Sequence, residues 1–402
     1  MRYTHIPLLL RNIYTFKGFR ISGLFLTEKE LRISLEKRRK TGTCPNCGKR
    51  CRKIEATYER TIRDLDFSGR MTWITFHQYK IVCSCHYRGI ELLDFVDKYS
   101  FYTRAFEGYV ARLCEKMSLK DVASLVRIDW KTAKHIDKKN LRKLIVPLSQ
   151  LNPEVIGVDE IAYEKGQKYL TIVRDVVAGM VIWIGIGRKE ETLDGFFKEL
   201  DKGKPRAISI VVMDMWDPYI ASVRKNCPDA AIVFDKFHIS RKINEALDSI
   251  RRAEFRKADD KERKGMKHKR FLILGRQKRL NDEQRETIED LKRINTRLYE
   301  AYLLKEQVLD IFDEADVHAA LVRLGKWMAN VQRLGIVPFL KVINTMKNYW
   351  YGIANYFRLR LTNAASEGFN NKINIIKRRA YGFRDLEYFM LKILQSCGWR
   401  AP

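Results

Sequence analysis

The sequence predicts a multidomain α/β protein whose mixed-sheet core carries carboxylates at the ends of its strands. Two apolar runs, Val155–Asp159 and Ala207–Met213, each lead to an aspartate, Asp159 in the first and Asp214 directly after the second. Aspartate is disfavoured inside strands, so two matching strand ends suggest a shared role. Five of the eight cysteines fall between Cys44 and Cys85, and helical periodicity begins near Phe101. At 402 residues, the chain is long enough for several domains.

The charge of the chain indicates a polyanionic partner. Lysine and arginine number 77 against 49 acidic residues, a net charge of +28. Nucleic acid is the leading candidate for such an excess. The sequence shows no signal peptide, and the apolar run Val176–Gly187 is too short to span a bilayer. We therefore expect no membrane partner and a cytoplasmic protein.

The clustered cysteines predict a structural zinc site. Cys44 and Cys47 form one pair, and Cys83 and Cys85 form a second pair about 35 residues later, after β-like runs that include Met71–Val82. Two pairs of thiolates at this spacing are typical of tetrahedral zinc in a ribbon hairpin. The second pair is Cys-x-Cys, so two alternatives for one ligand stay open: Cys51 and His86. Free thiols in a small β-domain are the other interpretation.

The segment after residue 101 predicts a helix-turn-helix. Ser118 can cap a helix over Leu119–Val126, and Asp129 can cap a second helix from Trp130 to about Lys143. The turn has Arg127 where such motifs often have glycine, so a plain helical hairpin is the alternative. Polar side chains near the start of the second helix are candidate DNA contacts. They are Lys131, Thr132, Lys134 and His135.

The central segment predicts a ribonuclease H-like core. Its strand-like runs are 155–159, 169–175, 180–187, 207–213 and 231–234, with a helix over 192–201 before the fourth strand. This β-β-β-α-β-α-β order is that of the ribonuclease H fold, in which the first and fourth strands are parallel neighbours. Asp159 and Asp214 are then adjacent, and two adjacent carboxylates favour a shared cation.

A third acid, Glu367, lies at the start of a predicted helix within Thr362–Ile376. Asn363 can cap this helix, and Glu367, Asn371 and Arg378 share one face of it. The opposite face offers three apolar residues to the core: Phe369, Ile373 and Ile376. The alternative is an exposed glutamate in a first helical turn, where the helix dipole favours an acid.

About 130 residues separate His238 from Glu367, too many for a loop, and they predict a helical insertion. We expect helices over 239–257, 282–312, 318–330 and 338–356. Residues 241–280 hold 15 basic and 6 acidic residues. Within the most basic run we expect Lys264, Lys267 and Arg270 to contact the DNA backbone, an interaction that is sensitive to salt.

Four motifs in this order resemble those of the ISL3 insertion-sequence transposases, and the resemblance covers nearly the whole chain. The motifs are Gly157-Val-Asp159-Glu, Met213-Asp214-Met-Trp-Asp-Pro-Tyr219, Asp235-Lys-Phe-His238, and Asn363-Ala-Ala-Ser-Glu367-Gly-Phe-Asn-Asn371 followed by Lys377-Arg-Arg-Ala-Tyr-Gly382. Those proteins also begin with a zinc ribbon and a helix-turn-helix. The spacing of the second cysteine pair departs from their usual pattern.

The resemblance implies a DDE transposase with Asp159, Asp214 and Glu367 as its acid triad. Asp235 and His238, with Asn371, are then accessory residues near the site. Hard carboxylate oxygens suit Mg²⁺ or Mn²⁺, and a pair of such ions supports in-line displacement at phosphate. The implied reaction is cleavage at the element's ends, followed by transfer of the 3′-hydroxyl into target DNA.

The implied partners are double-stranded DNA, both terminal inverted repeats and target, and a second copy of the chain in a synaptic dimer. The expected setting is the nucleoid of a prokaryotic cytoplasm. Two other functions stay open: a catalytically silent DNA-binding regulator, and a metal-dependent nuclease without strand transfer.

We expect five segments along the chain. Residues 1–98 form a β-rich region with the zinc ribbon (ligands within 44–86), and 99–150 form the helix-turn-helix. Residues 151–240 form the first part of the catalytic core, 241–345 the helical insertion, and 346–402 the final helices of the core.

Overall fold

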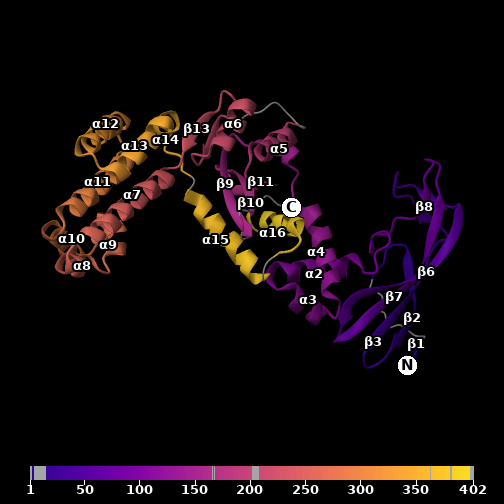
Figure 1. The fold of residues 1–402 in the computed structure, drawn as a ribbon. Helices are drawn as coiled ribbons and strands as arrows, with labels where there is room; N and C mark the ends of the chain where they lie inside the picture. Colours follow the sequence, from indigo (N-terminus) through magenta and orange to yellow (C-terminus); the bar gives the residue numbers. More distant parts are fainter. Residues whose placement is uncertain are drawn as a thin grey trace. The chain divides into compact units, whose positions relative to one another are not determined.

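The computed structural model describes residues 2–3, 15–164, 166, 168–201, 208–362, 364–380 and 383–398, with backbone alone at 2–3 and 364–367. The chain divides into two compact units (Figure 1). The first comprises 1–144 with 379–382, and the second comprises 145–378 with 383–402. The finer division into five segments stays a prediction.

The first unit is built on a six-stranded sheet in the order β1-β2-β3-β7-β6, with β8 paired to β7. Its strands are β1 (Arg2–Tyr3), β2 (Phe19–Leu26), β3 (Glu30–Lys37), β6 (Ile54–Phe67), β7 (Arg70–Val82) and β8 (Arg88–Ile90). β6 and β7 form a long antiparallel hairpin, whereas β3 and β7 are parallel. A separate two-stranded ribbon joins β4 (Gly42–Thr43) and β5 (Arg50–Cys51).

Three helices complete the first unit: α2 (Arg104–Lys116), α3 (Leu119–Val126) and α4 (Trp130–Leu144). Ser118 caps α3 as predicted, because its side chain accepts from the backbone N–H of Asp121. Arg127 occupies the turn in a left-handed conformation, φ 57°. Its guanidinium binds the Asp66 carboxylate and donates to the carbonyl of Gly69 (2.9 Å). The arginine therefore ties the turn to the β6–β7 hairpin, a role that glycine cannot perform.

The second unit contains a five-stranded mixed sheet in the order β11-β10-β9-β12-β13. Its strands are β9 (Val155–Glu164), β10 (Lys168–Asp175), β11 (Met180–Ile186), β12 (Ile210–Met213) and β13 (Ala231–Phe234). β9 to β11 are antiparallel, and β12 is parallel to both β9 and β13. The predicted ribonuclease H-like order is confirmed.

Helices cover both faces of this sheet (Figure 1). One face packs against α5 (Glu190–Leu200) and α6 (Asp217–Asn226) in the large core that includes Ile156 and Val158. The other face packs against α15 (Ala364–Arg379) and α16 (Leu386–Cys397) in a separate core that includes Ile161 and Ile172. Side chains of a strand alternate between faces, so neighbouring residues of β9 enter different cores.

The insertion is entirely helical among the described residues, as predicted. Two of its predicted helices are wrong, because each is broken into two separate helices. Its elements are α7 (Lys236–Lys257), α8 (Asp260–Met266), α9 (Arg270–Leu274), η2 (Gln277–Arg279), α10 (Asp282–Ile294), α11 (Thr296–Asp313), α12 (Val317–Leu334), α13 (Val337–Asn348) and α14 (Trp350–Leu359). The predicted helix 282–312 is broken at Asn295, whose side chain caps α11 from an extended conformation. The predicted helix 338–356 is broken at Tyr349.

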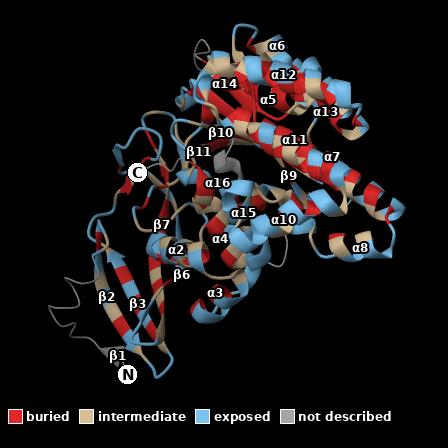
Figure 2. Ribbon diagram, turned by 90° about the vertical axis from the view of Figure 1, so that its left-hand side faces the viewer, coloured by how far each residue is buried: buried red, intermediate tan, exposed pale blue. Residues whose placement is uncertain are grey.

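Apolar periodicity could not reveal these breaks, because it continues through both of them. The buried sides of α7 and α11 pack together along the insertion (Figure 2). Leu247 and Ile243 of α7 and Leu298, Tyr302 and Phe312 of α11 belong to the same core as the sheet.

Candidate active site

Asp159 and Asp214 lie side by side at the ends of two parallel strands. In the β9–β12 register, Val212 faces Gly157. Two further residues along each strand bring Asp214 level with Asp159, directly beyond the last residue of β12. Asp214 is 8% exposed. The carboxylates of Asp159, Glu160 and Asp214 each offer an oxygen within 4.8 Å of the others.

Glu160 joins this cluster from the opposite face of β9. Asp159 is on the α15 side of the sheet and Glu160 on the α6 side, yet their carboxylates converge at the strand end beside Asp214. Burial, together with the charges of Asp214 and Asp159, raises the pKa of Glu160 to about 7. Its Oε2 is buried without a hydrogen-bond partner. This arrangement of like charges is costly unless a cation compensates for it.

His238 and Asp235 border the cluster in different ways. His238 Nδ1 is 2.6 Å from Asp214 Oδ1. Burial alone would lower the pKa of His238, but the hydrogen bond to Asp214 raises it. The Asp235 side chain accepts from the backbone N–H of Phe237 (3.0 Å) and so caps α7. Asp235 therefore starts the helix that brings His238 to Asp214.

Helix α15 meets Asp159 through Asn370, whose Nδ2 donates to Asp159 Oδ2 (3.1 Å). Phe369 of the same helix lies 5.1 Å from the guanidinium of Arg174, which is buried next to Asp159 and Asp235. Glu367 belongs to the first turn of α15, but its side chain lies outside the described residues.

The two faces predicted for α15 are only partly as expected. Phe369, Ile373 and Ile376 pack in the core as predicted. Asn371 and Arg378 are exposed, and the contact with Asp159 comes from Asn370 instead. Sequence analysis named Asn371, four residues after Glu367, but a residue three positions away is also a neighbour on a helix, so spacing alone does not distinguish Asn370 from Asn371.

The donor set of the cluster fits a hard divalent cation. Carboxylate oxygens are the ligands that Mg²⁺ prefers, and it uses one or two protein carboxylates while retaining water and phosphate. The unsatisfied Glu160 Oε2 and the raised pKa of Glu160 both indicate negative charge that the protein's own groups leave uncompensated.

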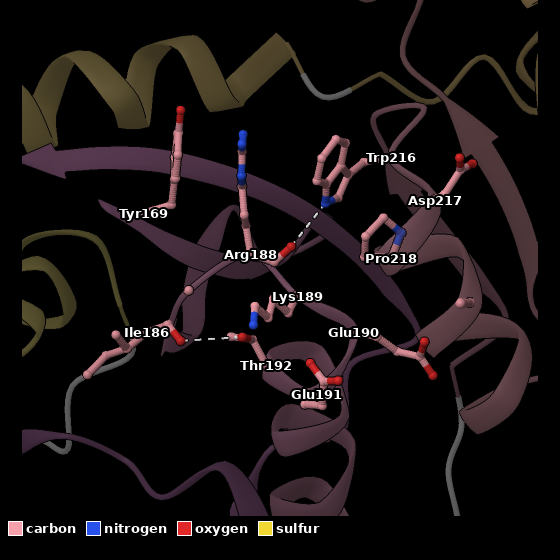
Figure 3. Close-up of a pocket in the computed structure, with 12 residues that line it drawn as sticks. Tyr169, Ile186, Arg188, Lys189, Glu190, Glu191, Thr192, Trp216, Asp217 and Pro218 are labelled. Carbon is pink, nitrogen blue, oxygen red and sulfur yellow. Dashed lines mark hydrogen bonds between the residues drawn. The ribbon is translucent and has the colours of Figure 1, made fainter. Parts of the chain in front are cut away.

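A groove of about 850 Å³ is lined mainly by residues that follow β11 and β12, and its Trp216 comes two residues after Asp214 (Figure 3). Its lining includes Tyr169, Arg188 and Trp216. The Arg188 guanidinium lies between the two rings, 4.1 Å from the centre of Tyr169 and 4.9 Å from that of Trp216. The indole N–H of Trp216 donates to the carbonyl of Arg188 (3.0 Å).

The second ligand cluster is the predicted set of thiols, Cys44, Cys47, Cys83 and Cys85, all within 4.8 Å of one another. The Sγ atoms of Cys44 and Cys85 are 3.6 Å apart, and those of Cys47 and Cys83 are 3.5 Å apart. Zinc–sulfur bonds of about 2.3 Å in a tetrahedron place sulfurs about 3.8 Å apart. The four thiols therefore fit a structural zinc ion.

The local chemistry of this cluster also suits zinc. The backbone N–H of Cys85 lowers the pKa of the Cys83 thiol to about 6, which favours the thiolate that binds metal. The pKa of Cys47 is raised to about 12: a backbone hydrogen bond from Lys49 lowers it, but burial and hydrogen bonds to the other three thiols outweigh that effect. Cys51 is buried nearby, but its sulfur donates to the carbonyl of Lys49 (3.7 Å). Within the described residues, neither Cys51 nor His86 belongs to the group of converging ligands.

Comparisons with known proteins match all three parts of the chain. Family models match residues 40–86 as the zinc-finger of transposase IS204/IS1001/IS1096/IS1165, residues 91–139 as the helix-turn-helix domain of transposase family ISL3, and residues 156–393 as a transposase. The transposase for insertion sequence element IS1001 of Bordetella parapertussis is 31% identical over 96% of this chain and 97% of its own length. The chain belongs to the ISL3 transposase family.

A second relative supports the same assignment over almost the whole length. The transposase for insertion sequence element IS1557 of Mycobacterium tuberculosis is 27% identical over 92% of this chain and 89% of its own length. The predicted order of zinc ribbon, helix-turn-helix and catalytic core is thus confirmed, as is the resemblance to ISL3 transposases. Among the described residues, no helix has the length and apolar character needed to cross a membrane.

The helix-turn-helix gives this transposase a DNA-binding domain. Lys131 and His135 are exposed on α4, whereas Thr132 and Lys134 are half-buried. In the insertion, Lys264 and Lys267 are exposed, and Arg270 pairs with Asp248 (3.3 Å).

Sequence reasoning missed three residues in or near the acid cluster: Glu160, Asn370 and Arg188. Glu160 directly follows Asp159 on a strand, and strict alternation assigns it to the other face. Arg188 follows β11 with no motif around it. The signal available for Asn370 was its spacing of three residues from Glu367, the same helical neighbourhood as Asn371.

Proposed function

We propose that this transposase cuts DNA at the ends of its insertion sequence and transfers the freed 3′-hydroxyl into target DNA, with Asp159, Asp214 and Glu367 as a DDE triad. The observation that carries the proposal is the convergence of Asp159 and Asp214 at adjacent ends of parallel strands, with α15 bonded to Asp159.

Helical geometry supports Glu367 as the third acid. Positions 367 and 370 are three residues apart and share one side of α15. Asn370 bonds to Asp159, so that side is the one directed at the first aspartate. Glu160 approaches instead from the α6 side and lacks a hydrogen-bond partner for Oε2.

The residues of the site have distinct roles in the proposed phosphodiester chemistry. Asp159 and Asp214 would hold Mg²⁺ between the strand ends, and Glu367 would add a ligand from α15. Two such ions, when bound, activate an attacking oxygen and stabilise the leaving oxygen of an in-line displacement. Asn370 fixes the orientation of Asp159, and His238 fixes that of Asp214 through the 2.6 Å contact.

Conservative substitutions test the triad. Asp159→Asn, Asp214→Asn and Glu367→Gln should each lower cleavage of end DNA by at least about a thousand-fold, the scale on which active sites stabilise transition-state charge. Binding of the same DNA should change by a few-fold at most. Glu160→Gln is the comparison variant, because Glu160 belongs to the same cluster but not to the proposed triad. It should retain far more activity than Glu367→Gln.

The opposite ranking of the two glutamates would replace Glu367 by Glu160 in the triad. Loss of binding in place of cleavage would mean that the acids are structural and would favour a DNA-binding regulator. A strand-transfer assay with pre-cut ends separates a transposase from a nuclease, because a nuclease cuts but does not join them.

DNA contact by the insertion forms a second part of the proposal. Lys264 and Lys267 are exposed on and just after α8, in the most basic part of the chain. Substitution of each by Gln should reduce the slope of log affinity against log salt by about 0.9 for each phosphate that is no longer neutralised. Arg270→Gln should also reduce the slope, but by less than either lysine variant, because Asp248 already pairs with Arg270. An unchanged slope in the lysine variants would remove this run from the interface.

We also propose that the recognition face of α4, with Lys131, Thr132, Lys134 and His135, reads the terminal repeats, and that Arg378 contacts the DNA backbone. Two ends must be handled together, so a homodimer is the expected assembly during synapsis. End DNA should therefore shift the transposase from monomer to dimer in sedimentation velocity.

A further inference from the structure

The groove lined by Tyr169, Arg188 and Trp216 has a cationic centre that the chemistry described above does not use. Arg188 lies in the short link between β11 and α5, and its guanidinium lies between the Tyr169 and Trp216 rings (Figure 3). Across the part of the chain that the structure describes, this guanidinium makes no hydrogen bond or ion pair. A buried or half-buried arginine usually has such a partner.

The stack fixes the guanidinium in one plane. Cation–π contacts on both faces hold it there, while the N–H donors point outward along its edge. Such a fork matches the oxygens of a phosphate, and little rotamer entropy remains to be lost on binding. The ring of Tyr169 comes from β10, and that of Trp216 from the turn that precedes α6.

This fork lies close to the acid cluster. The backbone N–H of Trp216 donates to the carbonyl of Asp214 (2.8 Å), so one wall of the stack is fixed to the second aspartate. Arg188 also acts electrostatically on Glu160 and on Tyr219, whose hydroxyl bonds to Thr171 (2.8 Å). Arg188 is therefore close enough to the acids to act on a DNA phosphate near the one that the acids would hold.

The remainder of the groove restricts where a phosphate can sit. Glu190 and Glu191, in the first turn of α5, line it, and so does Asp217, which accepts from the Tyr349 hydroxyl (2.7 Å). Glu190 has a distant partner in Lys225 (3.7 Å). These carboxylates repel a phosphate from their wall, which leaves the Arg188 side as its place.

We propose that Arg188, clamped between Tyr169 and Trp216, binds one backbone phosphate of the DNA strand next to the linkage that is cut. The inference rests on the proposed function, because it takes the acids to mark the cut. The role of Arg188 is to hold the DNA strand so that the linkage to be cut lies at the acids.

The experiment measures the coupling between Arg188 and single phosphates. Full-length protein is titrated, without added divalent metal, with duplexes of the terminal repeat in which one phosphate near the cut is replaced by a neutral methylphosphonate. For the unaltered protein, neutralising one particular linkage should weaken binding by about tenfold or more, the scale of a charge-assisted hydrogen bond. The affinity of Arg188→Ala for unmodified DNA should be lower by the same factor. Replacing that one phosphate by the methylphosphonate should then cause no further loss of affinity in this variant.

Two further variants keep the test decisive. Arg188→Lys retains the charge but loses the fork, so its affinity should lie between those of Arg188 and Arg188→Ala. Lys189→Ala, in the next residue of the same groove, should weaken binding slightly and equally at every linkage. Thermal unfolding of each variant shows whether it is folded.

The inference would be overturned if each methylphosphonate lowered the affinity of Arg188→Ala and of the unaltered protein by the same factor. It would also be overturned if no single methylphosphonate lowered the affinity of the unaltered protein more than the others. Binding is measured without cleavage, so either outcome would leave the proposed triad supported as long as the acid variants still fail to cut DNA. Coupling at Arg188 in a protein whose acid variants cut normally would instead reject the proposed function.

Discussion

The thiol cluster and the carboxylate cluster of this transposase have similar dimensions but opposite energetics. Each gathers potential ligand atoms within 4.8 Å. Cys44 and Cys47 come from the turn between β4 and β5, and Cys83 and Cys85 come from the turn between β7 and β8. Four thiolates complete a tetrahedron around zinc. The acids come from two separate strands and leave Glu160 Oε2 buried without a partner.

The thiol cluster with zinc stabilises the fold, whereas the carboxylate cluster without a cation reduces its stability. A structural zinc ion contributes folding free energy directly, and its coordination shell is closed. Clustered carboxylates cost stability in the absence of a cation, and protein carboxylates alone leave positions for water and phosphate at Mg²⁺. We expect the first cluster to be sensitive to loss of any ligand, and the second to gain stability when a charge is removed.

The largest expected effect follows from removing zinc. Structural zinc binding supplies on the order of 10 kcal/mol, so Cys83→Ser should release the metal and melt the ribbon of β4 and β5 with the nearby hairpin end. Zinc content by elemental analysis and hydrogen exchange over residues 41–98 measure this change. Affinity for end DNA should fall as well.

Cys51→Ser is the matched control for the zinc cluster. This cysteine is buried beside the four thiols, but its sulfur bonds to a backbone carbonyl. Zinc content should therefore remain at one ion per chain. A zinc-free Cys51→Ser together with a zinc-bound Cys85→Ser would reassign the fourth ligand.

A smaller effect of opposite sign should follow from Glu160→Gln. Burial and neighbouring charges raise the pKa of Glu160 to about 7, so at alkaline pH its carboxylate destabilises the folded state. The uncharged amide should raise stability by about 1 kcal/mol, or about 2–4 °C in melting temperature without divalent metal. Added Mg²⁺ should stabilise the unaltered protein more than the variant.

Glu164→Gln provides the control for this second prediction. Glu164 lies on the same strand and is exposed, with a surface ion pair to Lys168 (2.6 Å). Such pairs contribute little, so its melting temperature should hardly change. A lower melting temperature for Glu160→Gln would contradict the comparison, because the acid cluster would then be part of the structural framework.

Several features of the transposase were determined by the sequence itself, because their causes are local. Ser118 caps α3 within three residues, and the order of strands in the core follows from short apolar runs and the segments between them. Apolar periodicity also assigned Phe369, Ile373 and Ile376 to the buried face of α15. Each of these needs only the hydrogen bonds or alternation of one element.

Tertiary structure decided the geometry of the candidate site and which further residues join the two aspartates that the sequence analysis expected to be adjacent. Asp159 meets Asp214 only because β9 and β12 pair in one particular register, and Glu160 reaches them because the strand end lets side chains of both faces converge. Arg188 acquires its two aromatic neighbours from β10 and from the turn after β12. These contacts join residues far apart in the chain, and their geometry depends on strand pairing and packing, which no local pattern encodes.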